Sequence, residues 1–378
     1  MIHSGIEVAQ PPVPWGRISA GAVLITVVMF FITYEPRPDH AWQKVQNSAP
    51  WPARDRFASV VHNKKIWVIG GAQDFWEGST LKSQKFDEVW SSEDGSRWQR
   101  EAAAVPFLMR TYMATATYQN RIWVLGGWDV EGRNSSAAWS YGEADGWKLA
   151  IAQAPWGARG GSAAIAFRGK LWLFGGTKQN PGERPSNYND VWSTVDGENW
   201  KLETPSAEWQ PRAYHQVVKF KDKLWLIGGG EWYKVPQIYA DVWSSADGVS
   251  WTKETDKASW GTRLWSASSS DDQYMWITGG AGLIESESKG AVWFSKDGRF
   301  WEPYLAEGFP ARRAHGALML GDYLYVVGGS NLDAYNDVWR VETHLANRTW
   351  QGSLARSMVN LRRSLWRSFV SFRQSISG

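Results

Sequence analysis

Short apolar runs that end in a Gly-Gly pair recur along the 378-residue chain. In the run LWLIGG, which ends at Gly229, four apolar residues directly precede the glycine pair. The charged residues of the preceding segment QVVKFKDK lie mainly at the C-terminal end of that segment. Runs this short, rich in β-branched and aromatic residues and without a 3.6-residue period, predict β-strands and exclude a helical solenoid. The pairs recur every 49 to 56 residues: Gly70-Gly71, Gly126-Gly127, Gly175-Gly176, Gly228-Gly229, Gly279-Gly280 and Gly328-Gly329.

Three positions upstream of each glycine pair keep one residue type in all six repeats. An aromatic residue stands three positions before the first glycine, an arginine sixteen before it and a second aromatic residue nineteen before it. In the fourth repeat these are Trp225, Arg212 and Trp209. Fixed spacing at three positions in six repeats is the signature of one structural unit used six times.

Each repeat also predicts a hairpin downstream of its glycines. A tryptophan follows every pair, and in five repeats a second tryptophan stands eight residues later with Asp-Gly between the two, as in DVWSTVDGENW. Asp-Gly between strand-like runs is a hairpin signal. A repeat therefore contains four strands, in the fourth repeat Ala213–Phe220, Leu224–Ile227, Asp241–Ser245 and a strand around Trp251. Many of the 28 tryptophans would fill the space between neighbouring sheets.

The spacing of tryptophans also predicts how the two ends of the repeat array meet. Trp42 stands twelve residues before Arg54, the spacing that also separates Trp98 from Arg110. The last repeat lacks its Asp-Gly turn, so we expect residues near Ala41–Val45 to supply the outer strand of the sixth unit. Alternatively, Trp350 lies in the closing strand and Trp42 in a fifth or capping strand.

With this arginine, this strand into Gly-Gly and these downstream tryptophans, the chain resembles kelch-repeat propellers, a broad group that includes the central domain of galactose oxidase. The resemblance covers about residues 40–350 and implies an all-β, six-bladed kelch-type β-propeller; the repeats are longer than those of WD40 propellers. It is specific for fold and not for function, because propellers have many roles. The copper chemistry of galactose oxidase needs a cysteine-crosslinked tyrosine, and this chain has no cysteine.

The N-terminal region differs from the repeats. Ile18–Tyr34 is uncharged, and its 17 residues would form a helix about 25 Å long, near the lower limit for a membrane span. The following TYEPRPDH has no small-x-small cleavage site, so we expect an uncleaved anchor rather than a signal peptide. The sequence thus predicts a tail at 1–14, a transmembrane helix at 15–35 and a propeller at 40–350, on the extracytoplasmic (periplasmic or extracellular) side of the membrane.

Residues 351–378 predict a basic amphipathic helix. From Leu354 to Ile376, apolar residues recur at spacings of three and four, arginines fall largely on other faces, and no acid follows Glu342. Such a helix can lie on an anionic membrane surface. Alternatively, it packs on its own propeller or on a partner protein.

Composition excludes several kinds of chemical site. The net charge of +3 gives no reason to expect a nucleic acid as partner. The absence of cysteine excludes disulfides, thiolate metal sites and a cysteine nucleophile. We find no metal-ligand cluster, nucleophile motif or phosphate-binding loop, and expect no metal or cofactor. A catalytic site assembled from different blades would leave no local motif, so an enzyme stays open.

The repeated arginines are the first candidates for ligand contact. Strands one and two run antiparallel, so the arginines and the loops after the glycines share one face near the central channel. In kelch domains that bind acidic peptides, arginines at this position contact the ligand, and the resemblance implies the same for Arg54, Arg110, Arg159, Arg212, Arg263 and Arg312. The alternative is structural: each arginine stacks on the aromatic residue three positions earlier or binds carbonyls of the adjacent blade.

Positions that differ between repeats are the better guide to specificity. Two and three residues after the arginines stand candidates for a polar-aromatic pocket: Tyr112, Tyr214, His215, Trp265 and His315. Either histidine could be a general base or a hydrogen-bonded structural histidine. The loops after the glycines add Trp76, Trp128 and Trp232, which could contact a sugar or a protein.

Three functions fit this sequence. The favoured one is a membrane-tethered propeller that binds or scaffolds a protein or an anionic ligand without catalysis. The second is an extracytoplasmic sugar-modifying enzyme such as a sialic acid mutarotase, a group of similar propellers to which no local motif assigns this chain. The third is a structural subunit of a membrane complex, anchored through the C-terminal helix.

Overall fold

The computed structural model describes residues 41–343, apart from 103, 108, 180–182, 283–290 and 305–307. Within that part, no helix has the length and apolar character needed to cross a membrane. The helices expected at 15–35 and 351–378 lie outside the described residues.

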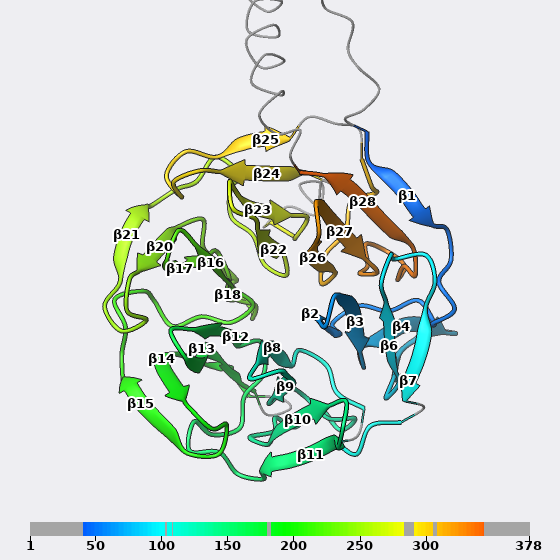
Figure 1. The fold of residues 1–378 in the computed structure, drawn as a ribbon, viewed down its shortest axis with the longest axis horizontal. Helices are drawn as coiled ribbons and strands as arrows, with labels where there is room; N and C mark the ends of the chain where they lie inside the picture. Colours follow the sequence, from blue (N-terminus) through cyan, green and yellow to red (C-terminus); the bar gives the residue numbers. More distant parts are fainter. Residues whose placement is uncertain are drawn as a thin grey trace, which may run out of the picture. The chain divides into compact units, whose positions relative to one another are not determined.

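Six four-stranded antiparallel sheets surround a central channel and form a six-bladed β-propeller (Figure 1). The first strand of each blade lies innermost, and β2, β8, β12, β16, β22 and β26 follow one another around the channel. From inside to outside, blade one is β2 (Ala58–His62), β3 (Lys65–Ile69), β6 (Val89–Ser92) and β7 (Gln99–Ala102). Blade two is β8 (Ala114–Tyr118), β9 (Arg121–Leu125), β10 (Ala138–Gly142) and β11 (Gly146–Ile151). Blade three is β12 (Ala163–Phe167), β13 (Lys170–Lys178), β14 (Ser186–Thr194) and β15 (Trp200–Thr204).

The second half of the ring repeats this order. Blade four is β16 (Gln216–Phe220), β17 (Lys223–Ile227), β20 (Val242–Ser245) and β21 (Thr252–Thr255). Blade five is β22 (Ala267–Ser270), β23 (Met275–Thr278), β24 (Val292–Ser295) and β25 (Glu302–Tyr304). Blade six is β26 (Gly316–Leu320), β27 (Tyr323–Val327), β28 (Val338–Glu342) and β1 (Gln43–Gln46). Two hairpins follow glycine pairs: β4 (Ala72–Glu77) with β5 (Thr80–Lys85), and β18 (Gly230–Glu231) with β19 (Gln237–Ile238).

The ring closes through the N-terminal strand, which confirms the expectation from Trp42. β1 pairs antiparallel with β28, with Gln43 opposite Arg340 and Lys44 opposite Trp339. Trp42 is buried and meets Phe309 edge-on at 4.7 Å between ring centroids. Near-perpendicular pairs of the same kind join the corresponding rings in the other blades: Trp51–Trp98, Phe107–Trp147, Trp156–Trp200, Trp209–Trp251 and Trp260–Trp301. Trp42 is therefore the fourth-strand tryptophan of blade six.

The Asp-Gly turns join strands three and four, as predicted. In blade three, Asp196 Oδ1 accepts hydrogen bonds from the backbone N–H groups of Glu198 (2.9 Å) and Asn199 (2.7 Å). Gly197 lies against Trp123 of blade two, where an added Cβ would come within 1.8 Å of the ring. This contact between neighbouring blades, at a φ of +83°, requires glycine.

We call the face with these turns the turn face, and the opposite face, with the arginines and the loops after the glycine pairs, the mouth face. The turns between strands one and two also lie on the turn face, because strands one to four alternate in direction. Thr343 donates its N–H to the Asp322 carbonyl in such a turn, and β1 begins beside the end of β28. Both ends of the described chain, Ala41 and Thr343, thus lie at the turn face.

Candidate ligand site at the channel mouth

The arginine of each repeat lies inside its blade. In blade four, Arg212 Nη1 donates to the Gly228 carbonyl at 2.9 Å, and both terminal nitrogens donate to the Asp241 carboxylate at 2.6 and 2.9 Å. The Tyr239 ring covers the guanidinium, with its centroid 4.1 Å from Cζ. Arg212 is 0% exposed, so its charge is paired within the blade.

The same bond to the first glycine of the pair occurs in all six blades, from Arg54, Arg110, Arg159, Arg212, Arg263 and Arg312. All of these arginines except Arg110 are buried. Ion pairs to acids of strand three hold Arg54, Arg159 and Arg312 as well. These bonds support the structural alternative, although the carbonyl belongs to the same blade and not to the adjacent one. The ligand role of the six arginines stays a prediction.

Two residues after each arginine, the backbone turns into the left-handed region. The φ angles at these positions lie between +50° and +64°, at Arg56, Tyr112, Gly161, Tyr214, Trp265 and Ala314. This turn starts strand one later than predicted: β16 begins at Gln216 and not at Ala213. Left-handed backbone costs about 1–3 kcal/mol for a residue other than glycine, and such strain concentrates at functional sites.

Five hydrogen bonds between neighbouring blades link the six left-handed residues around the channel mouth. Peptide N–H groups of Arg56, Tyr112, Gly161, Tyr214 and Ala314 each donate to the carbonyl of the corresponding residue in a neighbouring blade, at 2.7 to 3.0 Å. These bonds hold the strained backbone in place. They also fix the starting points of six side chains around one opening.

The side chains of this ring gather three predicted site residues into one aromatic cluster. Tyr112 meets Tyr214 at 5.0 Å between ring centroids, and Tyr214 meets Trp265 at 5.6 Å. Trp128 packs on Tyr112 at 5.0 Å, and Trp232 packs on Trp265 at 5.2 Å. Gly161 leaves room for Tyr214, because a Cβ on Gly161 would lie 2.8 Å from that ring. The cluster is half-buried and gives the mouth one aromatic wall.

Charged groups complete the mouth. The guanidinium of Arg56 lies 2.6 Å from Asp55 Oδ1 and 2.7 Å from Asp74 Oδ1. Burial by itself lowers the pKa of Arg56, but the two carboxylates outweigh burial and raise it. Arg313 lies over the Trp265 ring, with Cζ 5.5 Å from the centroid. Arg56 and Arg313 were not among the site residues predicted from the sequence. Their places, two after Arg54 and next to Arg312, could have suggested them.

Burial makes the two tyrosines of the ring weaker acids. It raises the pKa of Tyr112 above the usual range of a phenol, and also that of Tyr214. A tyrosine is a neutral phenol at pH 7 in any case, and the raised pKa values extend this state to more alkaline pH. A mouth of neutral phenols, indoles and a paired guanidinium can stack on a ligand and form hydrogen bonds with it.

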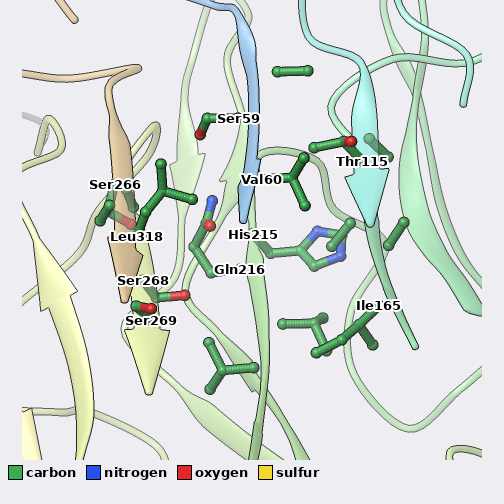
Figure 2. A pocket seen from close by; sticks show the side chains of 18 of the residues that line it. Ser59, Val60, Thr115, Ile165, His215, Gln216, Ser266, Ser268, Ser269 and Leu318 are labelled. Carbon is green, nitrogen blue, oxygen red and sulfur yellow. The ribbon is translucent and has the colours of Figure 1, made fainter. Parts of the chain in front are cut away.

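A cavity of about 480 Å³ continues from this mouth along the inner strands. Figure 2 shows its wall, where Val60, Ile165 and Leu318 alternate with the polar side chains of Ser59, Thr115, Gln216, Ser266, Ser268 and Ser269. Some of these groups join neighbouring blades; for example, Ser269 Oγ accepts the backbone N–H of Met319 at 3.1 Å. The channel wall is thus mixed in polarity and part of the packing between blades.

The two predicted histidines belong to this wall. Burial lowers the pKa of His215 to about 3 and that of His315 to about 3, so both are neutral at pH 7. His315 Nε2 lies 2.7 Å from Thr278 Oγ1, and the His215 ring packs on Trp209 at 5.8 Å. For neither histidine do the described residues show a hydrogen bond to a carboxylate. The geometry favours structural histidines over a general base.

The mouth face also carries exposed apolar loops. Trp76 is 69% exposed, Val235 85% and Leu332 93%, and each lies in the segment between strands two and three that follows a glycine pair, Trp76 on the β4–β5 hairpin. Phe75, Leu81, Val130 and Trp232 are further large apolar residues exposed in these segments. Within the described part of the chain, no three histidine or acidic side chains are arranged to hold a metal ion.

Comparison with known proteins shows the fold. No protein family and no curated protein matches this chain in sequence. Among solved structures, 405 chains match. One of them, described as "Structure of YjhT", aligns with a TM-score of 0.61 over 78% of this chain and 96% of that chain, at 16% sequence identity. At this identity the likeness supports the propeller fold and transfers no activity.

Proposed function

We propose that this chain is a membrane-tethered, kelch-type propeller that acts as a non-catalytic binding or scaffold module, and that its mouth face binds a protein or an anionic ligand. The exposed apolar side chains on the mouth loops carry this proposal. Exposed aromatic and aliphatic residues that gather on one face of a domain mark an interaction surface. The half-buried aromatic wall behind them provides a pocket for an anchoring group of the partner.

The positions of the two described chain ends fit this arrangement. Ala41 and Thr343 lie at the turn face, opposite the mouth. A membrane anchor at Ile18–Tyr34, and a surface helix at Leu354–Ile376, would be connected to the propeller at that face. The mouth would then be free to meet a partner on the extracytoplasmic side.

The test compares matched variants of the two faces in the full-length protein. A mouth variant carries Trp76→Ser, Trp232→Ser and Leu332→Ser; a turn variant carries Val195→Ser and Phe300→Ser, which are also exposed. Crosslinking in native membranes, followed by affinity purification, should recover a stoichiometric partner with wild type and with the turn variant but not with the mouth variant. A partner retained by the mouth variant and lost by the turn variant would contradict the proposal.

A sugar-modifying enzyme, such as a sialic acid mutarotase, is the second candidate. It is favoured by the combination of Tyr112, Tyr214 and Trp265 with the Arg56 guanidinium above a cavity of about 480 Å³. Aromatic rings can stack on a sugar ring, and a guanidinium can bind its carboxylate. A turnover assay on purified sialic acid anomers tests this candidate. Anomer exchange above the uncatalysed rate, lost in Tyr112→Phe/Tyr214→Phe, would establish it.

A further inference from the structure

Blade two departs from the common way of holding the repeat arginine. In blade four, the Asp241 carboxylate accepts from Arg212 at 2.6 and 2.9 Å and from the Trp243 indole Nε1 at 2.8 Å. One carboxylate thus satisfies two buried donors. Acids in the same position of blades one, three and six do the same: Glu88, Asp190 and Asp337.

Blade two has Ala137 where these four blades have the acid. Arg110 keeps its bond from Nη1 to the Gly126 carbonyl, at 3.3 Å, so its guanidinium has the same anchor. Arg110 Nε and Trp139 Nε1 are nevertheless buried without a hydrogen-bond partner among the described residues. The indole that meets a carboxylate in four blades is therefore unsatisfied here, and the described residues show no acid bonded to the terminal nitrogens of Arg110.

Blade two also lacks the aromatic cover. In the four blades with an acid, a ring two residues before it lies over the guanidinium, with centroids 4.0 to 4.5 Å from Cζ: Phe86, Tyr188, Tyr239 and Tyr335. Blade two has Ser135 at this position. Arg110 is accordingly half-buried, whereas Arg54, Arg212 and Arg312 are 0% exposed. Arg110 has lost both its counter-ion and its cover.

The charge nearest to Arg110 does not replace the acid. Burial lowers the pKa of Arg110, and the charge of Asp129 acts in the opposite direction. The Asp129 carboxylate, however, accepts from the backbone N–H groups of Glu131 (2.9 Å) and Arg133 (3.0 Å) and from the Arg133 guanidinium (3.0 Å). It is engaged in its own loop and forms no ion pair with Arg110 in the described structure.

Blade five shows that a missing acid alone does not leave the repeat arginine available to a ligand. Ala291 takes the acid's place there, and Trp293 Nε1 is buried without a partner in the described residues. Arg263 in that blade is buried, however, and has a further interaction. Blade two combines a half-buried guanidinium, an unsatisfied indole and a position at the mouth face.

We propose that Arg110 and Trp139 form a binding site for a carboxylate supplied by the ligand, which takes the place of the acid that blade two lacks. The inference rests on the proposed function, since it names the chemistry that the mouth face would recognise. The carboxylate would accept from the guanidinium and the indole N–H, as Asp241 does in blade four. It can belong to a free carboxylic acid or to an acidic side chain of a polypeptide.

The decisive variant is Ala137→Asp, which builds the missing acid into blade two. The probes are sodium acetate, and a blocked tripeptide with a central glutamate beside its glutamine counterpart, at constant ionic strength. Binding to the full-length protein is followed by calorimetry and by the indole N–H signal of Trp139, assigned with Trp139→Phe. Wild type should bind a carboxylate probe with a shift of that signal, and Ala137→Asp should bind at least tenfold more weakly while unfolding at a higher temperature.

Two further variants keep the test decisive. Ala137→Asn has the shape of aspartate without the charge and should retain more binding than Ala137→Asp. Arg110→Gln should abolish binding even if Ala137→Asp folds poorly. Binding of acetate and of the glutamate peptide alike supports a general carboxylate site; binding of the peptide alone supports the site with a polypeptide as source.

The inference is overturned if neither probe binds to wild type, or if wild type, Ala137→Asp and Arg110→Gln bind equally. Its failure can be told apart from failure of the proposed function. Partner crosslinking that survives in Ala137→Asp but is lost in the mouth variant leaves the binding face in place and removes only the carboxylate site. Crosslinking that survives in both removes the proposed function.

Discussion

The two faces of this propeller differ in how closely the blades resemble one another. On the turn face, the Asp-Gly turns of four blades share one hydrogen-bond pattern, in which a serine or threonine hydroxyl accepts the glycine N–H. On the mouth face, the loops differ in length and sequence from blade to blade. Among the described residues, twelve large apolar side chains are exposed; eight of them lie on the mouth face, and two, Val195 and Phe300, lie on the turn face.

This difference indicates which residues are free for function. Positions that keep one residue type in at least five of the six repeats, such as Arg212 and Gly197, are bonded within a blade or packed against a neighbouring one. Positions that vary, such as Tyr112 and Trp265, project from a strained backbone ring into the mouth. Residues that are the same across repeats hold the fold together, and residues that vary between repeats are the ones available to contact a ligand. The predictions below test this distinction, from the largest expected effect on stability to the smallest.

Arg212→Met should destabilise the protein most, because it leaves the Asp241 carboxylate buried without its cation. The loss should be about 3–5 kcal/mol. Arg110→Met, the matched variant in blade two, leaves no acid unpaired and should lower the free energy of unfolding by about 1 kcal/mol. Urea unfolding of both variants measures the difference. Equal losses would show that the ion pair of blade four adds nothing to the repeat arginine's role.

Gly197→Ala should cost about 2–4 kcal/mol, because its Cβ would overlap the Trp123 ring and its φ of +83° is left-handed. The control is Gly132→Ala in a mouth loop, which has a φ of +75° but open space around it. That change should cost about 1 kcal/mol, from backbone strain alone. Thermal unfolding with calorimetry separates the two. A similar loss for both would remove the contact between blades from the explanation.

Acid should destabilise the folded protein through its two buried histidines. Their pKa is about 3 in the fold and 6.5 in the unfolded chain, so between these values the unfolded chain binds more protons. Stability is therefore complete above pH 6.5 and falls as the pH drops, by about 1.4 kcal/mol per pH unit for each histidine. Urea titrations between pH 4 and pH 6 should show a smaller slope in His215→Gln/His315→Gln. An unchanged slope would mean that the histidines are not buried as neutral groups.

The mouth variant Trp76→Ser/Trp232→Ser/Leu332→Ser should change stability by less than about 0.5 kcal/mol per substitution, because these side chains are exposed. Loss of partner binding without loss of stability is the expected signature of a recognition surface. Circular dichroism melts beside the crosslinking experiment provide the comparison. A large fall in melting temperature would assign these residues to the fold instead.

The fold could be predicted because its signals recur at fixed spacing. The glycine pairs gave the six blades, and the twelve-residue spacing from Trp42 to Arg54 gave the closing strand β1. The gathering of Tyr112, Tyr214 and Trp265 followed from their common position in blades around one channel. Strand starts were less predictable, because the left-handed turn at Tyr214 has no signature in a residue type that rarely adopts it.

The burial of the arginines could not be predicted from their own positions. Arg212 is satisfied by Asp241, which stands 29 residues later, directly before β20. A signal did exist, since the acid stands two residues before the strand-three tryptophan in four blades: Glu88, Asp190, Asp241 and Asp337. Only the structure shows that the arginine and this acid meet. No sequence signal predicted the bond between His315 and Thr278, because it joins two blades at positions without a repeated pattern.

The most direct test of the central claim is hydroxyl-radical footprinting of the full-length protein in its native membranes and after purification. The account predicts that Trp76, Trp232 and Leu332 on the mouth face become at least threefold more reactive when the protein is purified away from its partner. Phe300 on the turn face, 77% exposed, should react equally in both. Unchanged reactivity at the mouth residues, or protection confined to the turn face, would contradict the assignment of the mouth as the binding face.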